Sequence, residues 1–177
     1  MSCLPGFQKS TIQPMTLRTT VVFGLGLAIG LAVRTGAAQD RRLPGMNGVN
    51  HLAFATPKYA EMLKFYTETL GFTEAFSNKN AEGQPTLTYI QASRNTFIEL
   101  MPAAATRAAG FTHLGLHVDD VQAVAARLRE RGLEVGAPRT IGSGSLTVNI
   151  TDPDGNRLEV SELPAGAPAR KAMDSWR

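Results

Sequence analysis

The feature that most constrains the fold of this sequence is an internal repeat. Residues 48–101 and residues 111–162 pass through the same landmarks in the same order: a histidine in an apolar stretch, a helix-like stretch that ends at a glycine, and a β-prone stretch that carries a glutamate. The histidine precedes the glutamate by 48 residues in the first half and by 46 in the second. Landmarks matched at this period indicate two copies of one supersecondary unit.

Each half predicts one helix close to its start. In the first half, Thr56 can cap a helix whose apolar residues recur at helical spacing as far as Gly71. In the second half, Asp119 or Asp120 is the cap and Gly132 ends the helix. The two glycines follow the histidines of their halves by 20 and 19 residues, so both helices occupy the same place in the repeat.

Three short β-prone runs follow each predicted helix: FTEAF, TLTYIQA and TFIELM, then LEVGAP, SLTVNIT and RLEVSEL. Each half therefore predicts a βαβββ module, at about 48–102 and 110–163, within a domain that spans 48–163. A sheet covered by one helix leaves its other face bare. We therefore expect an α+β fold in which the two modules pair over a shared concave face.

Strand geometry places four polar residues on that concave face: His51, Glu99, His113 and Glu159. Each is flanked by apolar residues, which we expect to pack under the helices because alternate side chains of a strand point to opposite faces. Two imidazoles and two carboxylates give a neutral site with a divalent ion. Mixed nitrogen and oxygen ligands suit Mn, Fe, Co, Ni or Zn better than Ca. For any one of these residues taken alone, a structural role is the better interpretation. Because four positions match between the two halves, metal binding becomes the better interpretation of the set.

Two further features lie near the predicted cavity. His117 shares a strand face with His113, so it can line the cavity as an acid, a base or a substrate contact, or lie at a solvated rim. Residues 140–146, TIGSGSL, lack the lysine and the following helix of a phosphate-binding loop. This segment is interpreted as a mobile loop near the cavity or an ordinary turn.

The ends of the chain predict segments outside the domain. Residues 20–33 are a continuous apolar run after Arg18, and small residues precede Gln39, which is typical of a Sec-type signal peptide over 1–38. Met15 is an alternative start. Fourteen helical residues span about 21 Å, short of the roughly 30 Å hydrocarbon core, so we expect cleavage and a periplasmic or secreted protein rather than a stable membrane insertion.

Two flanking segments complete the predicted organisation. Residues 39–47 form a linker, and residues 164–177, rich in Ala and Pro, predict a flexible tail with Trp176 as its candidate contact to a partner subunit. Three of the 18 basic side chains precede residue 39, which leaves 15 basic and 15 acidic groups in the mature protein. This balance argues against nucleic-acid binding. Cys3 is the only cysteine, so an intrachain disulfide is excluded.

The segments NHLAFAT, FYTETLGF, FIEL, THLGLHVDD and DPDGNRLEV resemble the vicinal oxygen chelate superfamily, which includes glyoxalase I, bleomycin-resistance proteins and extradiol dioxygenases. The resemblance implies two βαβββ modules that form a cup-shaped sheet around a metal bound by His51, Glu99, His113 and Glu159. It also implies a homodimer and a small-molecule substrate with neighbouring oxygens. Four filled ligand positions resemble glyoxalase I and related lyases or isomerases, in which a ligand glutamate, here Glu159 or Glu99, shuttles a proton beside the metal.

Three alternatives stay open at this point. An extradiol-type dioxygenase would use two His and one Glu, and a non-enzymatic antibiotic-binding protein of the bleomycin-resistance type would need no metal. Metal-dependent opening of a small epoxide antibiotic would need a basic residue that binds a phosphonate, for which Arg94, Arg107 and Arg157 are candidates.

Overall fold

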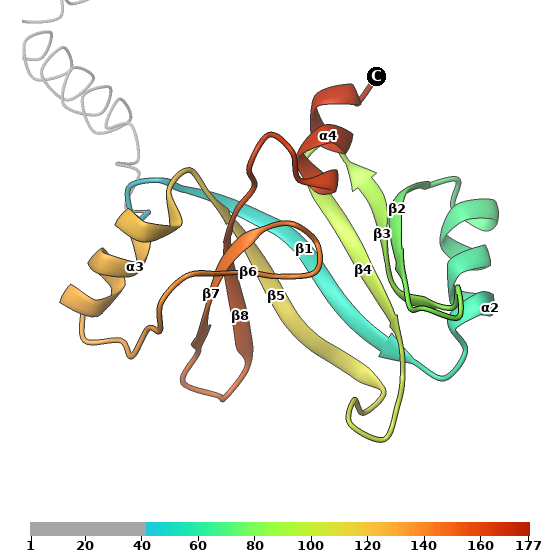
Figure 1. The fold of residues 1–177 in the computed structure, drawn as a ribbon, viewed down its shortest axis with the longest axis horizontal. Coiled ribbons are helices and arrows are strands. Elements are labelled where there is room, and N and C mark those ends of the chain that lie inside the picture. The colour runs from blue at the N-terminus through green and yellow to red at the C-terminus, as the bar shows by residue number, and fades with distance from the viewer. Residues whose placement is uncertain (1–41) are drawn as a thin grey trace, which may run out of the picture. The chain divides into compact units, whose positions relative to one another are not determined.

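The computed structural model describes residues 42–177 (Figure 1). The predicted signal peptide, the alternative start at Met15, Cys3 and the first residues of the predicted linker lie outside the described residues. Within residues 42–177 there is one eight-stranded sheet, with the strand order β2-β3-β4-β1-β5-β8-β7-β6. In the same part of the chain, no helix has both the length and the apolar character needed to cross a membrane.

The first module contains one strand, one helical segment and three further strands. These are β1 (Met46–Thr56), α2 (Tyr59–Lys64) with a π-helical continuation η1 (Phe65–Thr69), β2 (Thr73–Lys79), β3 (Pro85–Ser93) and β4 (Thr96–Pro102). The Thr56 hydroxyl accepts a hydrogen bond from the Lys58 N–H, and the helix begins after this turn. Gly71 has a φ of 72°, a left-handed conformation that glycine adopts without strain and that ends the helical segment.

The second module repeats this order. It contains β5 (Gly110–Val118), α3 (Val121–Glu130), β6 (Arg139–Thr140), β7 (Leu146–Thr151) and β8 (Arg157–Glu162). Of the two predicted caps, Asp120 is the one used: its carboxylate accepts from the Ala123 N–H at 2.9 Å. The strand predicted over LEVGAP is wrong. Only the two residues of β6 pair with β7, because the sequence after α3 is occupied by the glycine and proline of an extended connection.

The two modules join through their first strands. β1 pairs antiparallel with β5, while β4 runs parallel to β1 and β8 runs parallel to β5, so each module presents its first and last strands at the centre of the sheet. The α+β fold of two paired βαβββ modules is therefore confirmed. Both modules come from the same chain among the described residues, and the concave face lies over β4-β1-β5-β8.

The convex face is only partly covered. Helix α3 packs on the second module with Val121, Val124 and Ala125 buried against Val118 and Val160. The prediction that all apolar neighbours of the candidate ligands pack under helices is wrong at the centre of the sheet. Leu52 on β1, one of these neighbours, is 38% exposed, because α2 contacts β1 and β4 and α3 contacts β7 and β8 without covering this residue. Phe111 on β5, outside that set of neighbours, is 47% exposed.

The C-terminal segment is a helix rather than the predicted flexible tail. Pro168–Ser175 form α4, which begins with Pro168 in its first turn. Ala169 and Met173 are buried against Tyr89 and Phe97, which face inward from the first module. The Gln91 amide also donates to the Ala172 carbonyl at 3.2 Å. The segment is ordered because these apolar partners, distant in sequence, give its short apolar stripe a surface to cover.

Candidate metal centre

The four predicted ligands meet at the centre of the sheet. His51 on β1 and His113 on β5 come from the two middle strands, and Glu99 on β4 and Glu159 on β8 flank them, each of the four at most 5% exposed. The Nε2 atoms of the two imidazoles are 3.1 Å apart. The Glu99 carboxylate lies 3.4 Å from the His51 Nε2 and 3.6 Å from that of His113, and the Glu159 carboxylate lies at 3.8 and 3.5 Å from the same two atoms.

These separations fit donors that surround one ion. For bonds of about 2.1 Å, adjacent donors lie about 3.0 Å apart in an octahedron and about 3.4 Å apart in a tetrahedron. Ligand atoms of His51, His113 and Glu159 all lie within 4.8 Å of one another, whereas Glu99 approaches both imidazoles but lies outside this group of three. The nitrogen and oxygen donors match the class of divalent ions expected from the sequence. The residues present therefore fit such an ion, and metal binding stays a prediction.

The outer nitrogens of both imidazoles are also engaged. The His51 Nδ1 lies 3.1 Å from the Asn50 side-chain oxygen, and the His113 Nδ1 lies 3.0 Å from the Thr112 hydroxyl. Arg157 donates to the His113 Nδ1 at 2.6 Å and pairs with Glu159 at 3.2 Å. The Asn50 oxygen can accept from the His51 Nδ1–H, an arrangement that orients an imidazole for metal binding through Nε2. Arg157 can only donate, so its contact makes the His113 Nδ1 an acceptor and places the proton of the neutral ring on Nε2, which a bound metal would have to displace.

Burial sets the charge state of the site. Burial lowers the pKa of His51 from 6.5 to about 4 against the opposing charge of Glu99, so the ring is neutral near pH 7 and its lone pair is available. Burial by itself would raise the pKa of Glu99, but the hydrogen bond from His113 and the charges of both histidines hold that pKa below its usual value. For Glu159, burial dominates and raises the pKa.

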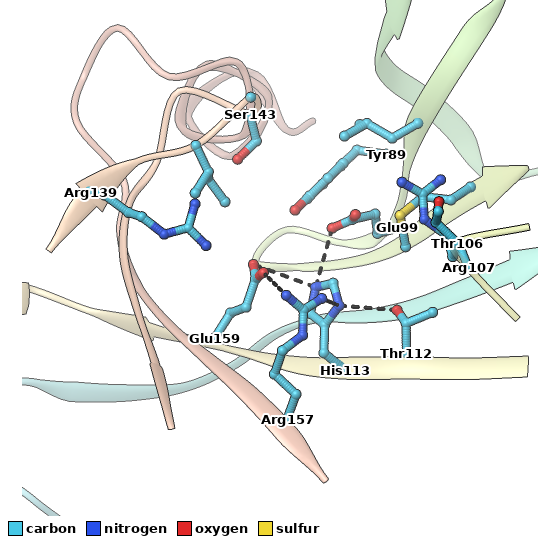
Figure 2. Close-up of a pocket in the computed structure, with 14 residues that line it drawn as sticks. Tyr89, Glu99, Thr106, Arg107, Thr112, His113, Arg139, Ser143, Arg157 and Glu159 are labelled. Atoms are coloured by element: carbon cyan, nitrogen blue, oxygen red, sulfur yellow. Dashed lines mark hydrogen bonds and ion pairs between the residues drawn. The ribbon is translucent and has the colours of Figure 1, made fainter. Parts of the chain in front are cut away.

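A pocket of about 440 Å³ opens over Glu99, His113 and Glu159 (Figure 2). Its remaining lining residues are Leu87, Tyr89, Met101, Thr106, Arg107, Thr112, Arg139, Ile141, Gly142, Ser143 and Arg157. The volume lies within the range of small-molecule sites. The glycine-rich segment predicted to lie near the cavity does so through Ile141, Gly142 and Ser143, and the Asn78 amide of the first module donates to the Gly142 carbonyl at 2.8 Å.

Tyr89 is a pocket residue that the sequence reasoning missed. Its ring stacks on Phe76, and its hydroxyl is hydrogen-bonded to Glu99 and Ser143. Burial raises its pKa well above 10, so the hydroxyl keeps its proton and acts as a donor. The signal that reveals it is the strand register, in which Tyr89 on β3 lies directly beside Glu99 on β4. That register was not known from the sequence.

His117 is not brought to this pocket. It lies four positions after His113, about 13 Å along β5, and it is absent from the pocket lining. It lies where the charges of Asp119 and Arg170 act on it, and burial lowers its pKa. Of the basic residues considered for phosphonate binding, Arg107 and Arg157 line the pocket and Arg94 does not.

Comparison with known proteins adds a family and a set of relatives. Residues 48–160 match the family model of the Glyoxalase/Bleomycin resistance protein/Dioxygenase superfamily. A 2-epi-5-epi-valiolone epimerase from Actinomyces sp is 30% identical over 157 residues, which cover 72% of this chain and 86% of that protein. A solved methylmalonyl-CoA epimerase is 25% identical with a TM-score of 0.56, covering 70% of this chain and 99% of its own. The Mycobacterium tuberculosis methylmalonyl-CoA epimerase, at 20% identity and a TM-score of 0.56 over 69% of this chain and 93% of its own, shares the fold.

Proposed function

Because the chain belongs to the Glyoxalase/Bleomycin resistance protein/Dioxygenase superfamily and its relatives include epimerases, we propose that it is a metal-dependent epimerase of a small substrate with neighbouring oxygens. Epimerisation next to a carbonyl removes a proton from carbon and returns a proton to the opposite face. The proton-shuttling glutamate predicted from the resemblance to glyoxalase I performs the same elementary step. The epimerase relatives support inversion at one carbon among the lyase and isomerase reactions expected from the sequence.

The observation that supports this proposal is the placement of two carboxylates around one imidazole pair. Glu99 comes from β4 and Glu159 from β8, the strands on either side of the β1-β5 pair, so the carboxylates approach from opposite sides. A bound divalent ion would supply Lewis-acid polarisation of the substrate oxygens. Glu159 would take the proton from carbon, and Glu99 on the opposite side, held in place by the Tyr89 hydroxyl, would return a proton to the other face.

The test is proton exchange at the substrate carbon. The full chain, loaded in turn with Ni, Zn, Co, Fe or Mn, is incubated in deuterated water with methylmalonyl-CoA, with 2-epi-5-epi-valiolone and with smaller α-substituted carbonyl compounds, and exchange is followed by NMR. We expect exchange with at least one compound, and a loss of 100-fold or more in Glu159→Gln because general-base catalysis contributes about 10²–10⁴-fold. His117→Gln, outside the pocket, is the matched control and should retain the rate. Full activity in both Glu159→Gln and Glu99→Gln would overturn the proposal.

Export is part of the same proposal. The support is the sequence of residues 1–38, with its basic start, apolar run and small residues before Gln39. Cell fractionation of a bacterial host that expresses the full chain, with N-terminal sequencing of the product, tests it. A protein that begins at Gln39 outside the cytoplasm is expected, whereas an uncleaved cytoplasmic product would contradict export.

A further inference from the structure

The lining of the pocket has more positively charged side chains than negatively charged ones. Its lining contains the guanidinium groups of Arg107, Arg139 and Arg157 and only two carboxylates, those of Glu99 and Glu159. Both carboxylates lie among the candidate metal ligands, where two of them neutralise one divalent ion. With the ion bound, the three arginines would leave the pocket with an excess of positive charge, which favours a negatively charged occupant.

The arginines are placed to contact such an occupant. Figure 2 shows Arg139 and Arg107 on opposite sides of the pocket, with Glu159 and His113 between them. Within residues 42–177 the Arg139 side chain has no hydrogen-bond or ion-pair partner, although its charge acts on Glu159. Arg107 uses one terminal nitrogen to donate to the Pro102 carbonyl at 3.2 Å, which fixes its stem and leaves its other donors available.

A neutral donor, the Ser143 hydroxyl, lines the same pocket as Arg139. Ser143, which is 3% exposed, lines the pocket from the segment that follows β6, and its hydroxyl is 3.0 Å from that of Ser145. The Asn78 contact to Gly142 ties this segment to the first module. The Arg139 guanidinium and the Ser143 hydroxyl, which line one pocket, can both donate hydrogen bonds to a carboxylate or phosphate group. Those from the guanidinium would be charge-assisted and therefore short and strong.

We propose that the substrate carries a carboxylate or phosphate group that Arg139 and Arg107 bind at the rim of the pocket while its reacting carbon faces Glu159. The inference rests on the proposed function because it takes this pocket as the substrate site. It adds the substrate class: a small oxyanion-bearing molecule, which distinguishes this pocket from one that takes an uncharged sugar-like compound. Arg139 and Arg107 are then specificity-determining residues that act on the substrate without taking part in proton transfer.

The experiment measures anion binding separately from catalysis. Methylphosphonate and acetate are titrated by calorimetry into the full chain loaded with its divalent ion, and then into Arg139→Gln and Arg107→Gln. Arg94→Gln, which removes the same charge outside the pocket, is the matched control. We expect each pocket variant to bind about tenfold more weakly, a change of about 1.4 kcal/mol, and the control to bind like the parent chain. Preference for methylphosphonate would indicate a phosphate ester, and preference for acetate a carboxylate.

Metal content of the same samples distinguishes the possible failures. An ion retained in all variants, together with anion binding that is absent or that falls equally in the Arg94→Gln control, would overturn this inference and leave the proposed epimerase intact. Anion binding that depends on Arg139 in a chain that retains its ion but exchanges no substrate proton would support the anion site and count against the proposed function. Thermal unfolding of each variant verifies that the fold is retained, and Arg107→Gln provides a second measurement if Arg139→Gln does not fold.

Discussion

His51 can occupy its place in the site because residue 115 has no side chain. Gly115 lies directly opposite His51 in the β1-β5 register, and a Cβ atom built there would lie 2.0 Å from the His51 Cε1. The ring therefore fills the space that any other residue at 115 would need. A glycine in the middle of a central strand weakens that strand, so its presence here is explained by the approach of the imidazole.

At the residue scale we predict that Gly115→Ala displaces the His51 ring and weakens metal binding by about 10–100-fold, the range seen when groups that orient a ligand are changed. Metal affinity measured by competition with a chromogenic chelator tests this. Gly136→Ala is the control, since a Cβ at 136 meets nothing within 4 Å. Equal affinities in the two variants would show that the His51 ring can move without loss.

The sequence was sufficient to identify the four candidate ligands but not the residues around them. His51, Glu99, His113 and Glu159 could be assigned to one face because strand alternation is a local rule. The positions of Gly115, Tyr89 and Arg139 depend on pairing between strands and on loop paths far apart in sequence. The sequence left His117 open between the cavity and its rim for a related reason: alternation gives the face of a strand but not the distance along it at which the cavity ends.

At the element scale, α4 shows how a short helix depends on its partners. The segment has only Ala169 and Met173 as buried residues, too few for a periodic pattern to stand out in the sequence. Their partners Tyr89 and Phe97 come from β3 and β4 of the first module. The helix therefore covers the inner face of that module beside Glu99, and the sequence alone gave no indication of a surface for it to cover.

We predict that Met173→Ala lowers the free energy of unfolding by about 2 kcal/mol, the low end of the range for a buried methionine. The low end applies because α4 is a short helix with only two buried residues, so it can shift toward the space left by the smaller side chain. Urea unfolding followed by circular dichroism measures the change, with Lys171→Ala on the exposed side of the same helix as the control. If both variants lose the same small amount, α4 does not contribute to the folded core.

At the scale of the whole molecule, the repeat predicted the architecture because each module has one sheet face that its own helix does not cover. The repeat did not determine whether the two modules that pair come from one chain or from two. The segment between β4 and β5 is short and folded on itself through the Ala104–Arg107 bridge, which lets β5 return beside β1 of the same chain. The four candidate ligands therefore come equally from the two modules of one molecule.

This arrangement predicts that metal removal destabilises the whole domain. An ion bound only by the folded chain stabilises it by about 2.7 kcal/mol when free metal is 100 times Kd. Scanning calorimetry with and without a chelator should therefore show a Tm lower by several degrees in the stripped protein. His51→Ala serves as the control and should show no metal-dependent shift. An unchanged Tm in the parent chain would argue against an ion held between the modules.

The bare centre of the convex face supports the predicted homodimer, which remains a proposal. Leu52 pairs with Leu114 across β1 and β5, and Phe111 stacks edge-on against Phe54 with ring centroids 6.1 Å apart, so apolar side chains adjoin one another there. We expect sedimentation to show a dimer that Leu52→Glu dissociates. Phe65→Glu, at an exposed apolar residue on η1, should leave the dimer intact. A monomeric parent chain would contradict the proposal.

The position of Glu159 and α4 near the end of the chain has a consequence for biosynthesis. During synthesis the first module emerges early, yet its inner face has no cover until α4 appears, and its imidazole and carboxylate lack the last candidate ligand until β8 is made. A chain that has not yet reached β8 therefore has only an incomplete set of candidate donors. Metal selection would thus wait until β8 has been made, and if the chain is exported, the ion would be set by the compartment in which the domain finishes folding rather than by the one in which it was translated.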